Sequence, residues 1–282
     1  VESMTRAPLV MGKAETAFQR SAEVYDTTIG WRFVNPLMKA GYGVDPMPDT
    51  AENVAVEFGV SRAGQDAFAL RSQARAAAAI AADPLARRKV AGKKGATVTV
   101  DRDEHPRADT TLEALAKLKP IVRPDGTVTA GNASGVNDGA AALLLASPEA
   151  AERHGLRPLA RVLGMATAGV PPRIMGIGPV PATRKLLDRL GLSIGDFDLI
   201  EINEAFASQA LACLRELGIA DDAAHVNPNG GAIAYGHPLG MTGARIAGEV
   251  AAGLAEGRGR RGLATLCVGV GQGVSLALER VG

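Results

Sequence analysis

Apolar positions in the second half of the chain follow two patterns, one typical of buried strands and one typical of amphipathic helices. Residues 139–147 (GAAALLLAS) form a continuous apolar run bounded by turn residues, which predicts a strand buried on both faces. Residues 159–170 predict a second strand, and residues 181–193 predict an amphipathic helix. Three leucines form the apolar side of that helix: Leu186, Leu187 and Leu190.

The alternation continues to the end of the chain. Residues 197–217 predict a short strand, a sharp turn and a helix, and residues 244–257 predict a further helix. Residues 263–281 predict two strands joined through glycines. This order of elements indicates an α/β layered domain from about residue 140 onward.

Residues 1–136 are less regular, with turns and helices intermixed. A helix is predicted to start near Thr50, whose side chain offers a cap. Residues 61–82 predict a longer helix with Ser61 as its N-cap, and residues 112–117 predict a short one.

Composition excludes several classes of function. The 282 residues are 46% hydrophobic and 22% charged with a net charge of +1, which argues against a nucleic-acid or membrane partner. The basic run at 87–94 is short and lacks aromatic residues, so it predicts a solvated loop rather than a polyanion site. Two cysteines, Cys213 and Cys267, cannot form a disulfide framework and fit a reducing cytoplasm.

Candidate chemistry lies in three loops at predicted strand ends, where α/β proteins build their sites. The loops carry Asn203 with Glu204, His237, and Cys267. Each residue also has a structural interpretation: Asn203 as a helix N-cap, Cys267 as a small buried apolar group, and His237 as an incidental residue of a tight turn. Cys213, inside an apolar helix, is expected to pack in the core.

Taken together, the loops favour acyl transfer at a thioester. A thiol beside an imidazole forms an acid/base pair, because an imidazolium lowers the pKa of a thiol. Gly269 and Gly271 would let backbone N–H groups turn toward a developing oxyanion.

The sequence lacks the motifs of several other functional classes. GVGQGV lacks the dinucleotide-binding spacing, and neither a phosphate-binding loop nor a Gly-x-Ser-x-Gly motif is present. The four histidines, His105, His154, His225 and His237, show no metal-ligand spacing, so no metal is expected.

Four ordered motifs resemble those of the thiolases: VTAGNASGVNDGAAALLLAS, NEAFA, NPNGGAIAYGHPLGMTGAR and CVGVGQG. The opening VESMTRAPLVMGK also matches that family, and the resemblance covers essentially all 282 residues. It implies an α/β fold, a layered αβαβα sandwich whose N-terminal half is incomplete here. Residues 1–136 would be mainly the loop domain, 137–157 a remnant of the N-terminal half, and 158–282 the C-terminal half.

The resemblance also implies a ping-pong acyl transfer between CoA thioesters. His237 would be the base that activates the nucleophile, and Cys267 would exchange a proton with the incoming CoA thiol or the acetyl α-carbon. Asn203 would hold a water that binds the thioester oxyanion together with His237, and the N–H of Gly269 would serve a second oxyanion site.

Further residues match positions that line the CoA groove of the family. They are Met47, Arg107, Ala130, Ser134, Gly135 and Phe206, with Ser134 bonding the pantetheine arm. A guanidinium at Arg107 suits a nucleotide or phosphate group. Coenzyme A would be a substrate, with no permanently bound cofactor, and a homodimer or homotetramer is expected.

One departure concerns the nucleophile. In the family it precedes the segment that opens this chain, which begins at Val1 without an initiator methionine, and neither cysteine can replace it. We therefore expect the chain to be an incomplete piece that is inactive alone.

Residues 25–55 resemble the 3-oxoadipyl-CoA thiolases of aromatic-acid degradation, with Trp31, Arg32 and Asn35 as the distinctive part. Arg32 would pair with the distal carboxylate of the substrate, unless this loop is only a subunit contact. The alternatives are an acetoacetyl-CoA or medium-chain thiolase (an acetyl-CoA acetyltransferase) and a CoA-binding remnant without catalysis.

Overall fold

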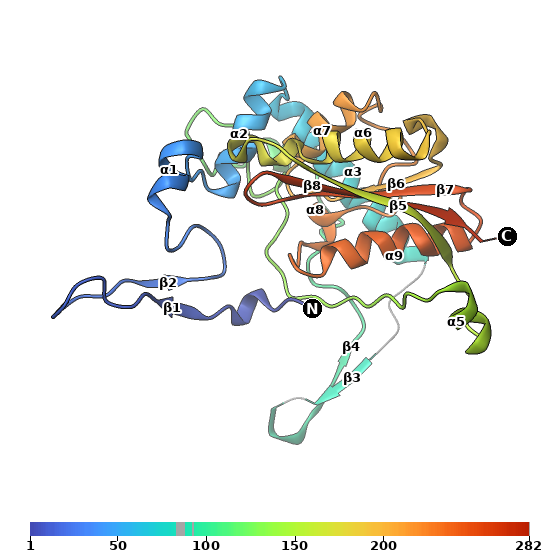
Figure 1. Cartoon of the computed structure of the whole chain (residues 1–282), viewed down its shortest axis with the longest axis horizontal. Coiled ribbons are helices and arrows are strands. Elements are labelled where there is room, and N and C mark those ends of the chain that lie inside the picture. The colour runs from blue at the N-terminus through green and yellow to red at the C-terminus, as the bar shows by residue number, and fades with distance from the viewer. Residues whose placement is uncertain (83–87, 92, 282) are drawn as a thin grey trace.

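The centre of the fold is one mixed sheet (Figure 1). The computed structural model describes residues 1–82, 88–91 and 93–281. Four strands form the sheet: β5 (Ala160–Gly169), β6 (Leu199–Ile202), β7 (Arg261–Val268) and β8 (Gln272–Arg280). Their order is β5-β8-β7-β6, and only the β6–β7 pair is parallel. The strands expected at 159–170, 197–202 and 263–281 are thus confirmed.

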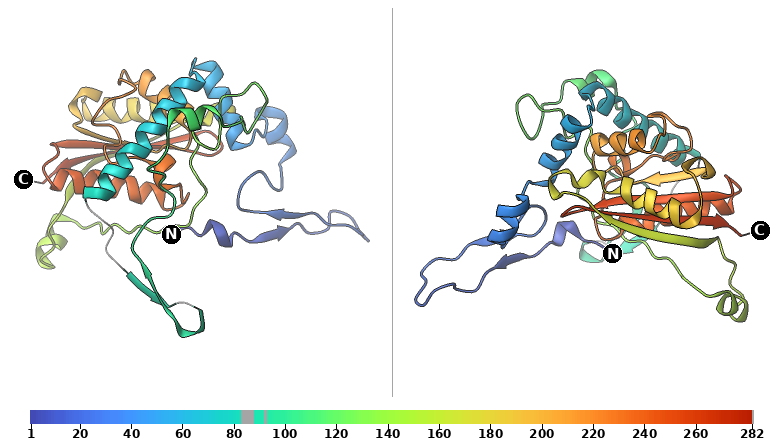
Figure 2. Two further views of the ribbon diagram at one scale, coloured as in Figure 1. Left: turned by 180° about the vertical axis from the view of Figure 1, so that it is seen from behind. Right: turned by 45° about the horizontal axis from the view of Figure 1, so that its top comes forward.

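Helices cover both faces of this sheet (Figures 1 and 2). Helices α6 (Pro179–Leu190) and α7 (Ala207–Glu216) lie on one face, and α9 (Thr242–Ala255) lies on the other. Neighbouring residues of β7 point to opposite sides, since Leu263 joins the core beneath α6 and α7 while Ala264 packs with α9. This period of two explains why both faces of the strand are apolar.

Part of the N-terminal segment packs outside α7. Helices α2 (Met47–Glu57) and α3 (Arg62–Ala82) contribute Val54, Phe68 and Ala69 to the core that α7 shares with the sheet. Ser61 caps α3 as predicted, because its Oγ accepts a hydrogen bond from the N–H of Gly64 at 3.2 Å.

Shorter elements complete the description. The helices are α1 (Pro36–Tyr42), α4 (Leu112–Ala116), α5 (Pro148–Arg153) and α8 (Ala232–Tyr235). The 3₁₀ turns are η1 (Met4–Arg6), η2 (Lys93–Gly95), η3 (Pro172–Ile177) and η4 (Ile194–Asp196). Two hairpins extend from the body, β1 (Leu9–Met11) with β2 (Val24–Asp26), and β3 (Arg88–Ala91) with β4 (Thr97–Val100). None of the helices in the described ranges is long and apolar enough to cross a membrane.

Three sequence predictions are wrong in detail. Residues 139–147 form no strand: only Gly139 makes a bridge, to Glu2, and Leu144 and Leu145 are 78% and 79% exposed. Helix α2 starts before Thr50, whose hydroxyl donates to the carbonyl of Met47 within the helix and caps nothing. The basic run is not simply a loop, since its described part includes strand β3; Arg87 and Gly92 lie outside the described residues.

A physical reason accounts for each error. The described part of the basic run lies in a hairpin, where β4 supplies the backbone partners that make β3 a strand. A strand needs a neighbour to bond its backbone, and no strand of the described ranges lies beside residues 140–147. Proline is tolerated in the first turn of a helix, where its missing N–H would have no intrahelical partner, so Pro48 does not delay α2. The described residues contain one helix-covered sheet; a second sheet of a five-layer sandwich is not among them.

Candidate active site

The first site loop follows β6. Asn203 is fully buried just beyond the carboxyl end of this strand, and its N–H donates to the carbonyl of Thr265 on β7 at 3.0 Å. The N-cap position of α7 belongs to Phe206 instead, so the interpretation of Asn203 as a helix cap is wrong. Its side chain is therefore free for another task.

A second loop, between α8 and α9, carries His237. Gly236 before it has φ 89°, which L side chains rarely adopt, and a Cβ there would overlap the amide of Asn137. The N–H of His237 lies 3.1 Å from the carbonyl oxygen of Gly135 and 3.2 Å from Oδ1 of Asn137. The glycine thus lets segment 135–137 lie directly against the histidine.

The imidazole ring contacts a polar group through each nitrogen. Nδ1 lies 2.7 Å from Oγ1 of Thr242, and Nε2 lies 3.3 Å from Nδ2 of Asn203. Burial, aided by the positive charge of Arg245, lowers the pKa of His237 to about 4. At neutral pH the ring is uncharged and can accept a proton.

Glu204 anchors the first loop to the second. Its carboxylate accepts hydrogen bonds from Oγ of Ser72 at 2.6 Å, Nδ2 of Asn227 at 2.9 Å and the N–H of Ile233 at 3.2 Å. A Cβ at Gly231 would overlap this carboxylate, so the Gly-Gly pair at 230–231 allows the close approach. Glu204 thus has a structural task, which sequence reasoning missed.

Cys267 lies near the end of β7 in a small buried cluster with Met175, Ala205, Met47 and Phe206. Burial raises the pKa of its thiol to about 12, and no imidazolium opposes this effect. The expected lowering of a thiol pKa by a charged histidine is therefore wrong for Cys267. Cys213 packs in the core as predicted, where its Sγ–H donates to the carbonyl of Gly176 at 3.3 Å.

The two glycines after Cys267 differ in their surroundings. Gly271 is buried, and its carbonyl accepts a hydrogen bond from the N–H of Val170 at 2.8 Å, so it packs against the neighbouring loop. Gly269 is only partly buried, with open space where a Cβ would stand. Only Gly269 therefore faces room for a ligand.

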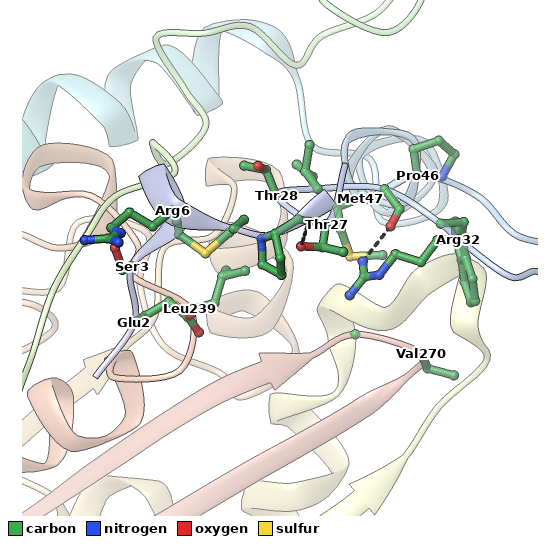
Figure 3. Close-up of a pocket in the computed structure, with 17 residues that line it drawn as sticks. Glu2, Ser3, Arg6, Thr27, Thr28, Arg32, Pro46, Met47, Leu239 and Val270 are labelled. Carbon is green, nitrogen blue, oxygen red and sulfur yellow. Dashed lines mark hydrogen bonds between the residues drawn. The ribbon is translucent and has the colours of Figure 1, made fainter. Parts of the chain in front are cut away.

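The open space beside Gly269 belongs to a cleft of about 910 Å³ (Figure 3). Gly269, Val270 and Met47 form part of its wall, and Trp31 and Arg32 form another part. Further lining comes from the N-terminal segment, which includes Glu2, Ser3 and Arg6. The substrate loop expected from the sequence and two of the candidate site residues thus line one cleft.

The remaining candidates divide into two groups. Ser134 joins the site, since its N–H donates to the carbonyl of Ala205 at 3.0 Å and Ala133 pairs with Phe206. Arg107 and Ala130 are exposed. Of the candidate site residues, only Met47 and Gly269 line the 910 Å³ cleft; His237, Asn203, Cys267 and Ser134 lie outside its lining.

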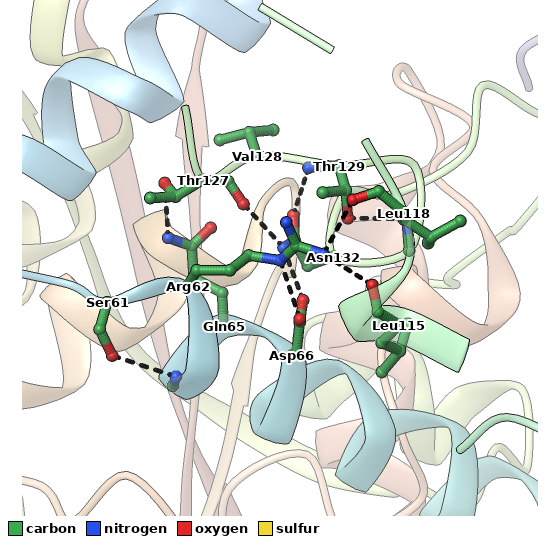
Figure 4. Close-up of polar contacts among 12 residues, drawn as sticks. Ser61, Arg62, Gln65, Asp66, Leu115, Leu118, Thr127, Val128, Thr129 and Asn132 are labelled. Atoms are coloured by element: carbon green, nitrogen blue, oxygen red, sulfur yellow. Dashed lines mark hydrogen bonds and ion pairs between the residues drawn. The ribbon is translucent and has the colours of Figure 1, made fainter. Parts of the chain in front are cut away.

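A buried polar clamp holds the segment that leads to Ser134 (Figure 4). Nδ2 of Asn132 donates to Asp66 at 2.9 Å and to the carbonyl of Thr127 at 3.0 Å, and Oδ1 of Asn132 accepts from the N–H of Thr129 at 2.8 Å. Asp66 in turn pairs with Arg62 at 2.8 Å on α3. In the described part of the chain, no group of three or more potential metal ligands lies together.

Comparison with known proteins identifies the family. The model of the "Thiolase, N-terminal domain" matches residues 1–149, and that of the "Thiolase, C-terminal domain" matches residues 156–280. The chain belongs to the thiolase family of acyltransferases.

Individual relatives match over the whole chain. The "Beta-ketoadipyl-CoA thiolase" of Pseudomonas aeruginosa is 68% identical, and the "3-oxoadipyl-CoA/3-oxo-5,6-dehydrosuberyl-CoA thiolase" of Escherichia coli is 61% identical. In both cases the match covers 100% of this chain and 71% of the relative.

Solved structures have the same fold. The Bacillus anthracis acetyl-CoA acetyltransferase is 42% identical with a TM-score of 0.88, over 99% of this chain and 70% of that one. Human mitochondrial 3-ketoacyl-CoA thiolase in complex with CoA is 40% identical with a TM-score of 0.86, over 99% of this chain and 69% of that one. The expected thiolase fold is thus confirmed.

Proposed function

We propose that this thiolase cleaves 3-oxoadipyl-CoA with CoA to give acetyl-CoA and a shortened acyl-CoA, in the degradation of aromatic compounds. The names of relatives that are 68% and 61% identical support this substrate. Coenzyme A acts as a substrate, and no cofactor stays bound. The proposal places the protein in the cytoplasm as a homodimer or homotetramer, in keeping with its two unpaired cysteines.

One observation carries the catalytic assignment, the contact between Asn203 and a neutral His237. His237 serves as the base that accepts a proton from the attacking thiol, because its ring is uncharged at neutral pH and keeps an unprotonated nitrogen. Oδ1 of Asn203 is buried without a hydrogen-bond partner. It suits a bound water that, with His237, stabilises the thioester oxyanion.

Cys267 exchanges a proton in this scheme. A thiol with a pKa of about 12 stays protonated at neutral pH, so Cys267 has a proton to give when the reaction begins. The N–H of Gly269 completes a second oxyanion site at the cleft. Neither Cys267 nor the core residue Cys213 is proposed as the acyl acceptor.

The CoA groove is proposed along Met47, Arg107, Ala130, Ser134, Gly135 and Phe206. Four of these residues support it by contact, since Met47 and Phe206 pack at Cys267, and Ser134 and Gly135 bond the loops of Phe206 and His237. Arg107 and Ala130 lie farther out, where an exposed guanidinium suits the phosphates of a nucleotide.

Arg32 is proposed to select a dicarboxylic substrate. It lines the cleft beside Gly269, and among the described residues its guanidinium bonds only the carbonyl of Gly30, with no carboxylate partner. A distal carboxylate of the substrate would give the guanidinium of Arg32 an anionic partner through a charge-assisted hydrogen bond.

The test is thiolysis of two substrates by the intact protein. Arg32→Ala should lower kcat/KM for 3-oxoadipyl-CoA roughly tenfold to a hundredfold, and leave acetoacetyl-CoA thiolysis nearly unchanged. Arg20→Ala, an exposed arginine of the β1–β2 hairpin that lies outside the cleft, is the control and should change neither. Equal loss on both substrates would rule out the selective role of Arg32.

An acetyl-CoA acetyltransferase is the alternative, favoured by 50% identity to an enzyme of that name from Pseudomonas aeruginosa. It predicts acetoacetyl-CoA as the better substrate. A non-catalytic CoA-binding protein predicts CoA binding by calorimetry with no thiolysis of either compound.

A further inference from the structure

Thr242, which sequence reasoning did not single out, lies on the far side of the His237 ring from Asn203. It is the first residue of α9 and is 0% exposed. Its Oγ1 stands 2.7 Å from Nδ1 of His237 and 3.1 Å from the carbonyl oxygen of Pro238. The hydroxyl therefore lies between two groups. The Pro238 carbonyl only accepts hydrogen bonds, and Nδ1 of His237 donates or accepts according to the tautomer of the ring.

A threonine hydroxyl has one hydrogen to donate, so the acceptor that this hydrogen points to fixes the tautomer of the His237 ring. When the hydroxyl donates to Pro238, Nδ1 must carry a hydrogen and donate it to Oγ1. Nε2 then has a free lone pair, which accepts from Nδ2 of Asn203 at 3.3 Å. This arrangement makes three hydrogen bonds.

The opposite tautomer makes fewer. If the hydroxyl donated to Nδ1, the Pro238 carbonyl would lose this bond and Nε2 would carry a hydrogen that faces the amide hydrogens of Asn203. Turning the amide by 180° would remove that clash and let Oδ1 accept from Nε2–H, but Nδ2 would then lack an acceptor as Oδ1 lacks a donor now, and the bond from the hydroxyl to Pro238 would still be lost.

We propose that Thr242 is a positioning residue that holds His237 in the Nδ1–H tautomer, so that the lone pair of Nε2 faces Asn203. The proposal rests on the proposed role of His237 as the base, because only this tautomer presents an unprotonated nitrogen on the side of Asn203.

Local structure keeps the hydroxyl in place. The N–H groups of Met241 and Thr242 donate to the Pro238 carbonyl at 3.0 Å and 3.2 Å, which folds the segment back over the histidine. Threonine is branched at Cβ, so its χ1 angle has few alternatives, and burial removes competing water.

The test is the ring ¹⁵N spectrum of His237 in the purified 282-residue protein, labelled at histidine and recorded near pH 7 without substrate. His237→Gln identifies its signals among the four histidines. The wild-type protein should show Nδ1 at the protonated position and Nε2 at the unprotonated position. Thr242→Val should shift the tautomer ratio toward Nε2–H by roughly threefold or more, whereas Thr242→Ser, which keeps the hydroxyl, should restore the wild-type pattern.

Two results would overturn the proposal. One is a wild-type spectrum with Nε2–H, which decides the matter even if a variant fails to fold. The other is a Thr242→Val spectrum identical to wild type. Because no substrate is present, the tautomer and the thiolysis activity of the intact protein can fail separately: thiolysis by the intact protein together with Nε2–H refutes the role of Thr242 alone, and no thiolysis by the intact protein together with Nδ1–H refutes the proposed function alone.

Discussion

At the scale of single residues, the surroundings of His237 set its chemistry. An exposed histidine is half-charged near pH 6.5, whereas the buried ring beside Arg245 has a pKa of about 4. The same burial raises the pKa of Cys267 to about 12. Both groups are therefore uncharged at neutral pH, so the site holds a neutral base and a protonated thiol rather than an ion pair.

The low pKa of His237 predicts a pH dependence of stability. In the unfolded chain the ring binds a proton below about pH 6.5, and in the folded chain only below about pH 4. Stability therefore falls as the pH drops through this window, because the unfolded state binds more protons. Once the pH has dropped through both pKa values, His237 has lowered the free energy of unfolding by on the order of 3 kcal/mol.

Urea unfolding at several pH values measures this effect. The free energy of unfolding should fall less steeply between pH 6.5 and pH 4 for His237→Gln than for the wild-type chain. His154→Gln replaces an exposed histidine on the protein surface and should follow the wild-type curve. Identical slopes for His237→Gln and wild type would contradict the buried, neutral ring.

At the scale of elements, one helix side chain holds the loop that leads into the site. Glu52 of α2 is buried, and its carboxylate accepts hydrogen bonds from the N–H groups of Thr127 at 2.6 Å and Val128 at 2.7 Å and from the Thr127 hydroxyl at 2.9 Å. Together with the Asn132 clamp, it fixes the backbone that runs toward Ser134.

Glu52→Gln should destabilise the protein by about 1.5–3 kcal/mol. The substitution removes the carboxylate charge, and the NH₂ group of the glutamine would face the N–H and O–H groups that now donate to Glu52. Amide hydrogen exchange should also quicken at Thr127 and Val128. Glu57→Gln on the same helix is the control: Glu57 forms an exposed ion pair with Arg173 at 3.7 Å, so its loss should cost less than about 1 kcal/mol. A Glu52→Gln variant as stable as this control would refute the anchoring role.

Elements whose residues bond locally or alternate strictly were predictable from the sequence. The spacing of apolar residues within one element is enough to identify a helix or strand of this kind, as for the strands β5, β7 and β8 and the helices α3, α6, α7 and α9. Residues 139–147 have the composition of a buried strand, but a strand also requires a partner, which the apolar pattern does not specify.

The candidate site was predictable only in part, for a related reason. Strand ends and glycines located Asn203, His237 and Cys267, yet the bonds of Glu204 to Ser72 and Asn227 join segments far apart in the chain. The pKa of Cys267 depends on how deeply the fold buries it, which spacing does not reveal. The Gly-Gly pair at 230–231 was the one local signal of the close approach to Glu204.

At the scale of the whole molecule, the sheet with its two helix layers is well packed, while an apolar segment beside it is not covered. Residues 140–147 run as an extended trace toward α5 and form no ladder (Figures 1 and 2). Leu144 and Leu145 are more than three-quarters exposed in this segment. Extended backbone with free N–H and C=O groups and apolar side chains favours pairing with another chain.

We therefore expect the 282-residue chain to self-associate through this segment. Replacing both Leu144 and Leu145 by lysine should reduce the concentration-dependent association seen by light scattering, because charge on an unpaired edge opposes pairing. It should leave the melting temperature nearly unchanged, since the two side chains are so exposed. Leu37→Lys on α1, where Leu37 is 82% exposed on a helix whose backbone is already bonded, should leave the association as it is. A wild-type chain that stays monomeric at all concentrations, or a double variant that associates as strongly as wild type, would show that exposure of this segment does not drive assembly.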